Sequence, residues 1–203
     1  MKIKSILSKI QKKFLNIIYL IKPKYFFYQS FNLFQNYAAK PKIIGLELNK
    51  NSLIGSRGEL IFLPSDAHLT WHILKYGELN YPISDIIKTR LNKNQNYTFI
   101  DIGANVGLVS RQLNISNENI DLYFCIEPVK NTFECLEKNT ENIENKYLFN
   151  FALGEENSLK DIYIDKSNHG NASLSESMMK FSKHNEFRSE KIIIKSVKDF
   201  FAS

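Results

Sequence analysis

Cysteine is scarce in this sequence of 203 residues, where Cys125 and Cys135 are the whole complement. Cys125 stands in an apolar, strand-like run and Cys135 in a helix-like one, and neither has a Cys-x-x-Cys pair or a histidine pair nearby. A structural zinc site takes about four such ligands, so no metal site can be built from these residues. We expect two reduced, structural thiols and a reducing compartment.

Long apolar runs are missing as well. No segment approaches the roughly 20 apolar residues that span a bilayer. The strongest candidate, residues 14–21, is not followed by the small residues of a signal-peptide cleavage site. The sequence therefore predicts a cytoplasmic protein.

Acidic residues are absent from residues 1–40, which carry eight lysines. The whole chain has a net charge of +6, so the remainder sums to 6 − 8 = −2 and the basic character belongs to this N-terminal arm. Apolar residues recur there at steps of three and four, which predicts an amphipathic helix that ends at Pro23. They are Ile3, Ile6, Leu7, Ile10, Phe14, Ile17, Ile18 and Ile21. Residues 1–21 either make a peripheral contact with the anionic inner membrane surface or pack on the protein's own body, and both readings stay open.

The rest of the chain divides into a lead-in region, residues 41–96, and a domain in which strand-like and helix-like segments alternate, residues 97–203. In the lead-in region, the segments IIGLELN and GELIFLP predict a small antiparallel pair. Residues 66–90 predict one or two helices, interrupted around Gly77 and Pro82.

Strand-like and helix-like segments alternate from residue 97 onward. The expected strands are residues 97–103, 121–128 and 146–154, and the expected helices between them are residues 105–113 and 131–143. This alternation is typical of crossovers that build a parallel sheet, so we predict an α/β, Rossmann-like domain. Two further strands are expected at residues 159–165 and 190–197, separated by a polar stretch.

The turn between the first strand and the first helix of this domain reads DIGANVG, residues 101–107. Gly103 and Gly107 let the backbone turn sharply and approach a ligand without an intervening side chain. Ligands of open parallel sheets lie beyond the carboxyl ends of the strands, where this turn is expected. Glu127 ends the next strand, and a carboxylate there can accept both hydroxyl hydrogens of a ribose. The sequence therefore predicts a ligand site between the turn and Glu127.

A dinucleotide is the competing ligand for this site. The glycine pattern here is G-x-N-x-G, and Asn105 replaces the middle glycine that lets the backbone reach a pyrophosphate. Asp101 would lie awkwardly beside a pyrophosphate, whereas a carboxylate is favourable near an ammonium or a sulfonium. The pattern thus favours a cofactor without phosphates.

Four segments occur in the order FIDIGANVGLVS, CIEPVKNTFECLEKN, NFALGEE and NHGNASL. In sequence and spacing they resemble the FkbM-type methyltransferases, and the resemblance covers roughly residues 76–201. It implies a class I methyltransferase fold and S-adenosyl-L-methionine as the cofactor. It also implies methylation of hydroxyl groups on sugars or natural products, in glycan or natural-product biosynthesis.

The same resemblance implies which residues bind the cofactor. Glu127, followed by Pro128, would hold the ribose, and the region of Ala152 would lie near the adenine. Asn168 and Gly170 match a polar N-x-G segment that belongs near the active site. The methionine part would be lined by Asp101, Gly103, Ala104, Asn105 and Gly107.

The sequence departs from this family after the segment IIIKSVKDFF, where the family pattern continues with another core strand and this chain reaches Ser203. We therefore expect an incomplete class I methyltransferase sheet that lacks its fourth strand and leaves one side of the first strand unpaired. A fragment, a truncated gene and a partner that supplies the missing strands remain open as explanations.

Transfer of a methyl group to a hydroxyl also needs a base. No spacing singles one out, so no catalytic residue is assigned; the candidates are His68, His72, His169, His184 and Glu78. The favoured function is O-methylation of a small-molecule or glycan hydroxyl. A catalytically inactive remnant or a membrane-surface binding module is the alternative. A nucleic-acid methyltransferase is disfavoured, because the sequence has no Asn/Asp-Pro-Pro-aromatic motif.

Overall fold

A computed structural model describes residues 43–47, 60–64, 83–92, 94–116, 119–165, 170–179 and 187–202. All of these residues belong to one unit of the chain, residues 42–203. The predicted amphipathic helix of residues 1–21, like the rest of the arm to residue 40, lies outside the described residues. Its membrane and packing readings stay predictions, and so do the predicted domain boundaries.

A three-stranded parallel sheet carries the motif-bearing part of the chain. Its strands lie in the order β3 (Tyr97–Ile102), β4 (Ile120–Ile126) and β5 (Lys146–Phe149), and both pairings are parallel. The crossovers run through α5 (Leu108–Ser116) and α6 (Lys130–Asn139). The expectation of an α/β fold with a parallel sheet is therefore confirmed. Among the strands that the structure describes, β3 pairs with β4 alone.

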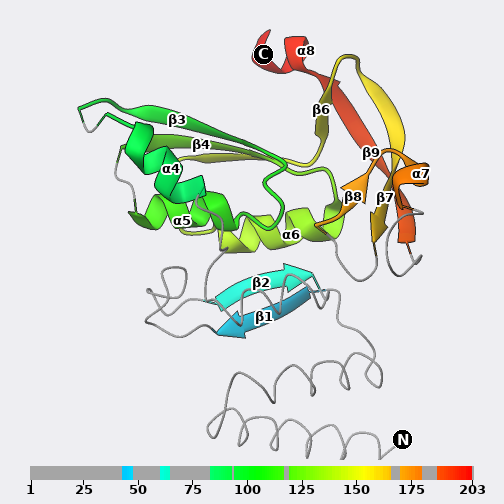
Figure 1. Ribbon diagram of the computed structural model, residues 1–203, viewed down its shortest axis with the longest axis horizontal. Helices are drawn as coiled ribbons and strands as arrows, with labels where there is room; N and C mark the ends of the chain where they lie inside the picture. The colour runs from blue at the N-terminus through cyan, green and yellow to red at the C-terminus, as the bar shows by residue number, and fades with distance from the viewer. Residues whose placement is uncertain are drawn as a thin grey trace, which may run out of the picture. The chain divides into compact units, whose positions relative to one another are not determined.

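The two faces of this sheet differ. Helices α5 and α6 lie on one face (Figure 1), where Tyr123 and Cys125 pack with residues of both helices in the main core cluster. Alternate residues of β3 turn to the other face, and Ile102 is 63% exposed there. The short helix α8 (Val197–Ala202) reaches this second face, because the Phe200 ring packs edge-on against Phe149, with ring centroids 5.2 Å apart. One face thus holds the core of the sheet.

A second sheet follows along the chain, with strands in the order β6-β9-β7-β8. Strand β6 (Ala152–Gly154) is parallel to β9 (Phe187–Ser196), whereas β7 (Ser158–Asp165) runs antiparallel to both β9 and β8 (Ala172–Ser173). The short helix α7 (Glu176–Met179) follows β8. Alternation in β9 buries Ile192 and Ile194 while Ile193 is 52% exposed. The two strands expected at residues 159–165 and 190–197 are therefore present as β7 and β9.

One expected strand is wrong in its extent. Residues 146–154 were predicted as one strand, but the chain leaves the parallel sheet after Phe149 and enters the second sheet at Ala152. Asn150 lies at the break, and its Nδ2 donates to the backbone oxygens of Glu127 at 2.9 Å and Pro128 at 3.1 Å. The asparagine side chain thus occupies the backbone oxygens after β4 that a longer β5 would have paired with.

The end of β9 also differs from the expectation, since Val197 was predicted in the strand and begins helix α8. Ser196 accounts for this change, because its hydroxyl oxygen accepts the backbone N–H of Asp199 at 3.0 Å, as an N-cap residue does. At its other end, β9 begins at Phe187 rather than at the expected residue 190.

The lead-in region contributes an antiparallel pair, β1 (Ile43–Glu47) and β2 (Leu60–Pro64), as predicted. Asn139 fixes β2 to helix α6, since its side chain exchanges two hydrogen bonds with the Phe62 backbone, at 2.6 and 2.7 Å. Helix α4 (Ile83–Arg90) is the described part of the helices expected over residues 66–90.

Both predicted thiols, Cys125 and Cys135, are buried, and neither forms a disulfide. In the part of the chain that the structure describes, no helix is long and apolar enough to cross a membrane.

Candidate functional site

The loop between β3 and α5 has an unusual backbone. Gly103 and Gly107 have φ values of 78° and 77°, and Asn105 between them has a φ of 51°. These values lie in the left-handed region, which glycine enters freely and asparagine tolerates better than most residues. The N–H groups of Gly103 and Ala104 both donate to the Ile126 carbonyl, at 2.9 and 3.0 Å. The loop therefore curls over the carboxyl end of β4.

The two glycines of the loop face different surroundings. A Cβ on Gly107 would lie 2.6 Å from Cδ1 of Leu136 and 2.9 Å from Cγ2 of Thr140, so only glycine lets the loop approach helix α6 this closely. A Cβ on Gly103 would meet no atom within 4 Å. Gly107 is therefore required by packing, whereas Gly103 borders open space that a ligand can enter.

Glu127 directly follows β4 and brings a carboxylate to the loop. Its Oε2 accepts the N–H of Asn105 at 3.0 Å and its Oε1 accepts the N–H of Val129 at 2.8 Å. A carboxylate has about four lone-pair sites, so each oxygen keeps a position for a further donor. Two backbone bonds therefore orient Glu127 as an acceptor for a ligand with two neighbouring hydroxyl groups.

The surroundings of Glu127 favour its protonated form. The residue is only 7% exposed, and this burial raises the pKa of the carboxyl group to about 7. The two backbone hydrogen bonds lower that pKa, while the carboxylates of Glu190 and Asp101 raise it. Glu127 consequently titrates near neutral pH, where a ligand that donates hydrogen bonds can shift it to the charged form.

Asp101 lies on the helix side of β3, and Ser110 of α5 donates a hydrogen bond of 2.6 Å to its Oδ2. The same serine Oγ lies 3.3 Å from Sγ of Cys125. Burial raises the pKa of Asp101, and the bond from Ser110 opposes that shift. The hydrogen bond from Ser110 thus fixes the orientation of the Asp101 side chain, two residues before Gly103.

The other predicted cofactor residues occupy different positions. Ala104 is 5% exposed and belongs to the main core cluster, so only its backbone can serve a ligand. The Pro128 carbonyl accepts a bond from Asn150. Ala152 begins β6 and packs against a second core cluster that contains Val129. The structure thus brings the loop and Glu127 together and places Ala152 on the neighbouring sheet.

Of the other predicted residues, the structure describes only Gly170. Gly170 lies in an exposed turn between β7 and β8. The remaining candidates lie outside the described residues, so their assignments stay predictions: Asn168, His68, His72, His169, His184 and Glu78.

One buried polar atom at the loop lacks a partner. Oδ1 of Asn105 is buried without a hydrogen-bond partner among the residues that the structure describes. A buried acceptor of this kind costs about 1–3 kcal/mol unless a donor reaches it. Together with the open space at Gly103 and the free positions on Glu127, it makes the loop suited to a ligand that carries hydroxyl or amino donors.

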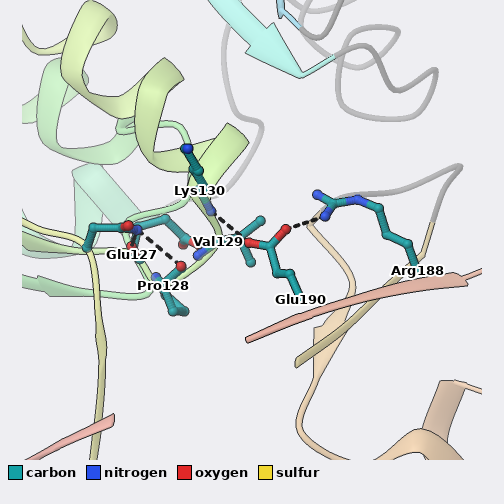
Figure 2. A network of polar contacts seen from close by, with 7 residues as sticks. Glu127, Pro128, Val129, Lys130, Arg188 and Glu190 are labelled. Atoms are coloured by element: carbon teal, nitrogen blue, oxygen red, sulfur yellow. Dashed lines mark hydrogen bonds and ion pairs between the residues drawn. The ribbon is translucent and has the colours of Figure 1, made fainter. Parts of the chain in front are cut away.

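Sequence reasoning missed four residues that support the site. Asn150 and Glu190 act through contacts distant in the chain, over 23 and 60 residues, which local patterns do not reveal. Figure 2 shows Glu190 between the start of α6 and Arg188. Ser110 alone had a local signal, a hydroxyl in the first turn of the helix that follows the motif. The four residues are Ser110, Asn150, Arg188 and Glu190.

Comparisons of the chain with protein-family models, with curated proteins and with solved structures found no match.

Proposed function

We propose that this chain is a methyltransferase with a Rossmann-like, class I cofactor domain, and that it binds S-adenosyl-L-methionine between the glycine loop and Glu127. The carrying observation is the Glu127 carboxylate, which two backbone N–H groups hold at the carboxyl end of β4 beside the loop. Parallel sheets bind ligands at this edge, and an acid at the end of the second strand is suited to a ribose diol.

The loop supports a cofactor without phosphates. Asn105 stands where a dinucleotide-binding loop needs a glycine, and Asp101 places a carboxylate two residues before Gly103. A fixed negative charge disfavours a pyrophosphate and favours an ammonium or a sulfonium. The dinucleotide is therefore the second ligand to test and not the first.

The described residues would bind and orient the cofactor. Glu127 would accept the two ribose hydroxyls, Asp101 would attract the methionine end, and Gly103 would leave room for the chain between them. When bound, S-adenosyl-L-methionine supplies a methyl group on a positively charged sulfur. We propose a sugar or other small-molecule hydroxyl as the acceptor, on the resemblance given above.

Calorimetric titration of the whole chain with S-adenosyl-L-methionine, and separately with NADH, tests this proposal. We expect binding of the first ligand and none of the second. Glu127→Gln should weaken binding about 10- to 100-fold, because hydrogen bonds to a charged group contribute about 1.5–3 kcal/mol. Glu155→Gln makes the same change at an exposed carboxylate of the β6–β7 turn and should leave the affinity unchanged. Failure of a folded chain to bind would overturn the proposal.

A further inference from the structure

Helix α6 has no cap of its own. The residue before it is Val129, whose side chain makes no capping bond, and the first turn holds no acidic residue. The first N–H groups of a helix need partners from outside the helix. The N–H of Lys130 finds one in Oε1 of Glu190, at 2.9 Å, although Glu190 belongs to strand β9. The second sheet therefore supplies the cap of α6.

The capping bond from Glu190 lies directly beside the Glu127 carboxylate, which would bind the ligand. Val129 and Lys130 are consecutive residues, and their N–H groups bind two different carboxylates, those of Glu127 and Glu190 (Figure 2). Only the backbone torsions of Val129, with a φ of −77° and a ψ of 118°, separate the two bonds. Loss of the Lys130 bond to Glu190 would therefore remove a restraint from the residue whose own N–H binds Glu127.

Strand β9 also packs against Val129, the residue just before helix α6. Alternate residues of β9 face one side, and on that side Ile192 and Ile194 bury Val129 in the second core cluster. Glu190 and Arg188 follow on the same side toward the start of β9, and Oε2 of Glu190 forms an ion pair with Arg188. Arg188 thus fixes the position of Glu190, as Figure 2 shows.

We propose that Glu190, held by Arg188, is a positioning residue that sets the orientation of Glu127 through the Val129–Lys130 backbone. This inference rests on the proposed function, since it assigns Glu190 to the cofactor site. It makes the second sheet part of the binding machinery, because the alignment of the ribose acceptor then depends on β9.

The first test needs no ligand. Hydrogen exchange of the backbone amides, measured by NMR on the whole chain, reports the bonds of Val129 and Lys130 separately. In Glu190→Ala we expect exchange at both amides to accelerate about tenfold or more, as the loss of a hydrogen bond of about 1–2 kcal/mol implies. Glu190→Gln keeps a carbonyl oxygen for the Lys130 N–H but loses the ion pair with Arg188, so it should restore protection at both amides only in part. Ser189→Ala, on the exposed side of β9, is the control for general damage to the strand.

The second test is the affinity for S-adenosyl-L-methionine. Glu190→Ala should weaken binding about tenfold, and Glu190→Gln, which keeps an acceptor for the Lys130 N–H but loses the ion pair, should weaken it less. Arg188→Gln removes the ion pair that fixes the position of Glu190 and should weaken binding in the same direction as Glu190→Ala. It provides a second variant if Glu190→Ala does not fold.

The outcomes separate this inference from the proposed function. If Glu190→Ala exposes only the Lys130 amide, with Val129 protection and affinity unchanged, Glu190 merely caps a helix and the inference is wrong. If the unaltered chain does not bind the cofactor, the proposed function fails, and the Val129 amide still decides whether Glu190 positions Glu127.

Discussion

The backbone N–H of Asn105 donates to Oε2 of Glu127 at 3.0 Å, and this bond joins the ends of two neighbouring strands. Asn105 follows β3 in a left-handed conformation, and Glu127 follows β4 as a buried carboxyl group. The loop conformation and the carboxylate orientation therefore depend on each other. A ligand that bound one of them would be sensitive to changes in the other.

Binding of S-adenosyl-L-methionine should depend on pH through Glu127. Its pKa is about 7, so the carboxylate that accepts the ribose hydroxyls is lost as the pH falls through neutrality. We expect affinity about tenfold weaker near pH 6 than near pH 8, because affinity follows the ionised fraction. Titrations at both pH values check this, and Glu127→Gln should show no such step. Equal affinity of the unaltered chain at both would contradict the prediction.

The two glycines of the loop should differ in what they contribute. Gly107→Ala should destabilise the fold by about 2–4 kcal/mol, since it adds left-handed strain of about 1 kcal/mol to overpacking of about 1–3 kcal/mol. Gly103→Ala adds only the strain, about 1 kcal/mol, but fills space beside the proposed cofactor. Urea unfolding measures the first effect and calorimetric titration the second. Gly103→Ala with full affinity would mean that the ligand lies elsewhere.

Asp101 should act on the charge of the ligand and not on the fold. Asp101→Asn keeps an acceptor for Ser110 while it removes the negative charge. We expect stability to be retained, and affinity for S-adenosyl-L-methionine to fall about tenfold, as for a lost charge-assisted contact. Adenosine, which lacks the methionine part, should bind both forms equally. The exposed Asp161→Asn is the matched control, and equal losses for both ligands would argue against this position for Asp101.

Asn139 should be the most costly polar residue to replace in helix α6. Its Nδ2 donates to the carbonyls of Phe62 and Val106, and its Oδ1 accepts the Phe62 N–H. Asn139→Ala should therefore destabilise the fold by about 2–4 kcal/mol, because it leaves buried backbone groups without partners. Urea unfolding checks this against Glu137→Ala, an exposed change in the same helix. A loss below that range would mean that the chain re-pairs these groups.

Local patterns were sufficient for most of the strands and helices. Apolar runs and their periods predicted β3, β4, β7 and β9, and the glycines with Glu127 identified a loop and an acid that the structure does place together. These features depend on residues close in the chain, or on the rule that parallel strands end at one edge.

The remaining features depend on single side chains that bind distant backbone. Asn150 reads as part of an apolar strand, yet its amide ends β5 by binding the end of β4. Ser196 reads as strand, yet its hydroxyl begins α8. Glu190 was predicted only as the first residue of a strand, yet its carboxylate binds the Lys130 N–H at the start of α6. The periodicity of apolar residues averages over several positions, so it cannot reveal at which residue a side chain ends the strand.

The second sheet begins and ends at nearly the same point of the fold. Ala152, where the chain enters this sheet, lies opposite Ile194, just before the chain leaves it. Insertions between β7 and β8 would therefore leave this junction unchanged, and with it the parallel sheet and its glycine loop, whereas changes to Glu190 would reach the start of α6. Evolution can therefore lengthen the β7–β8 connection while β9 and the edge formed by Gly103 and Glu127 stay the same.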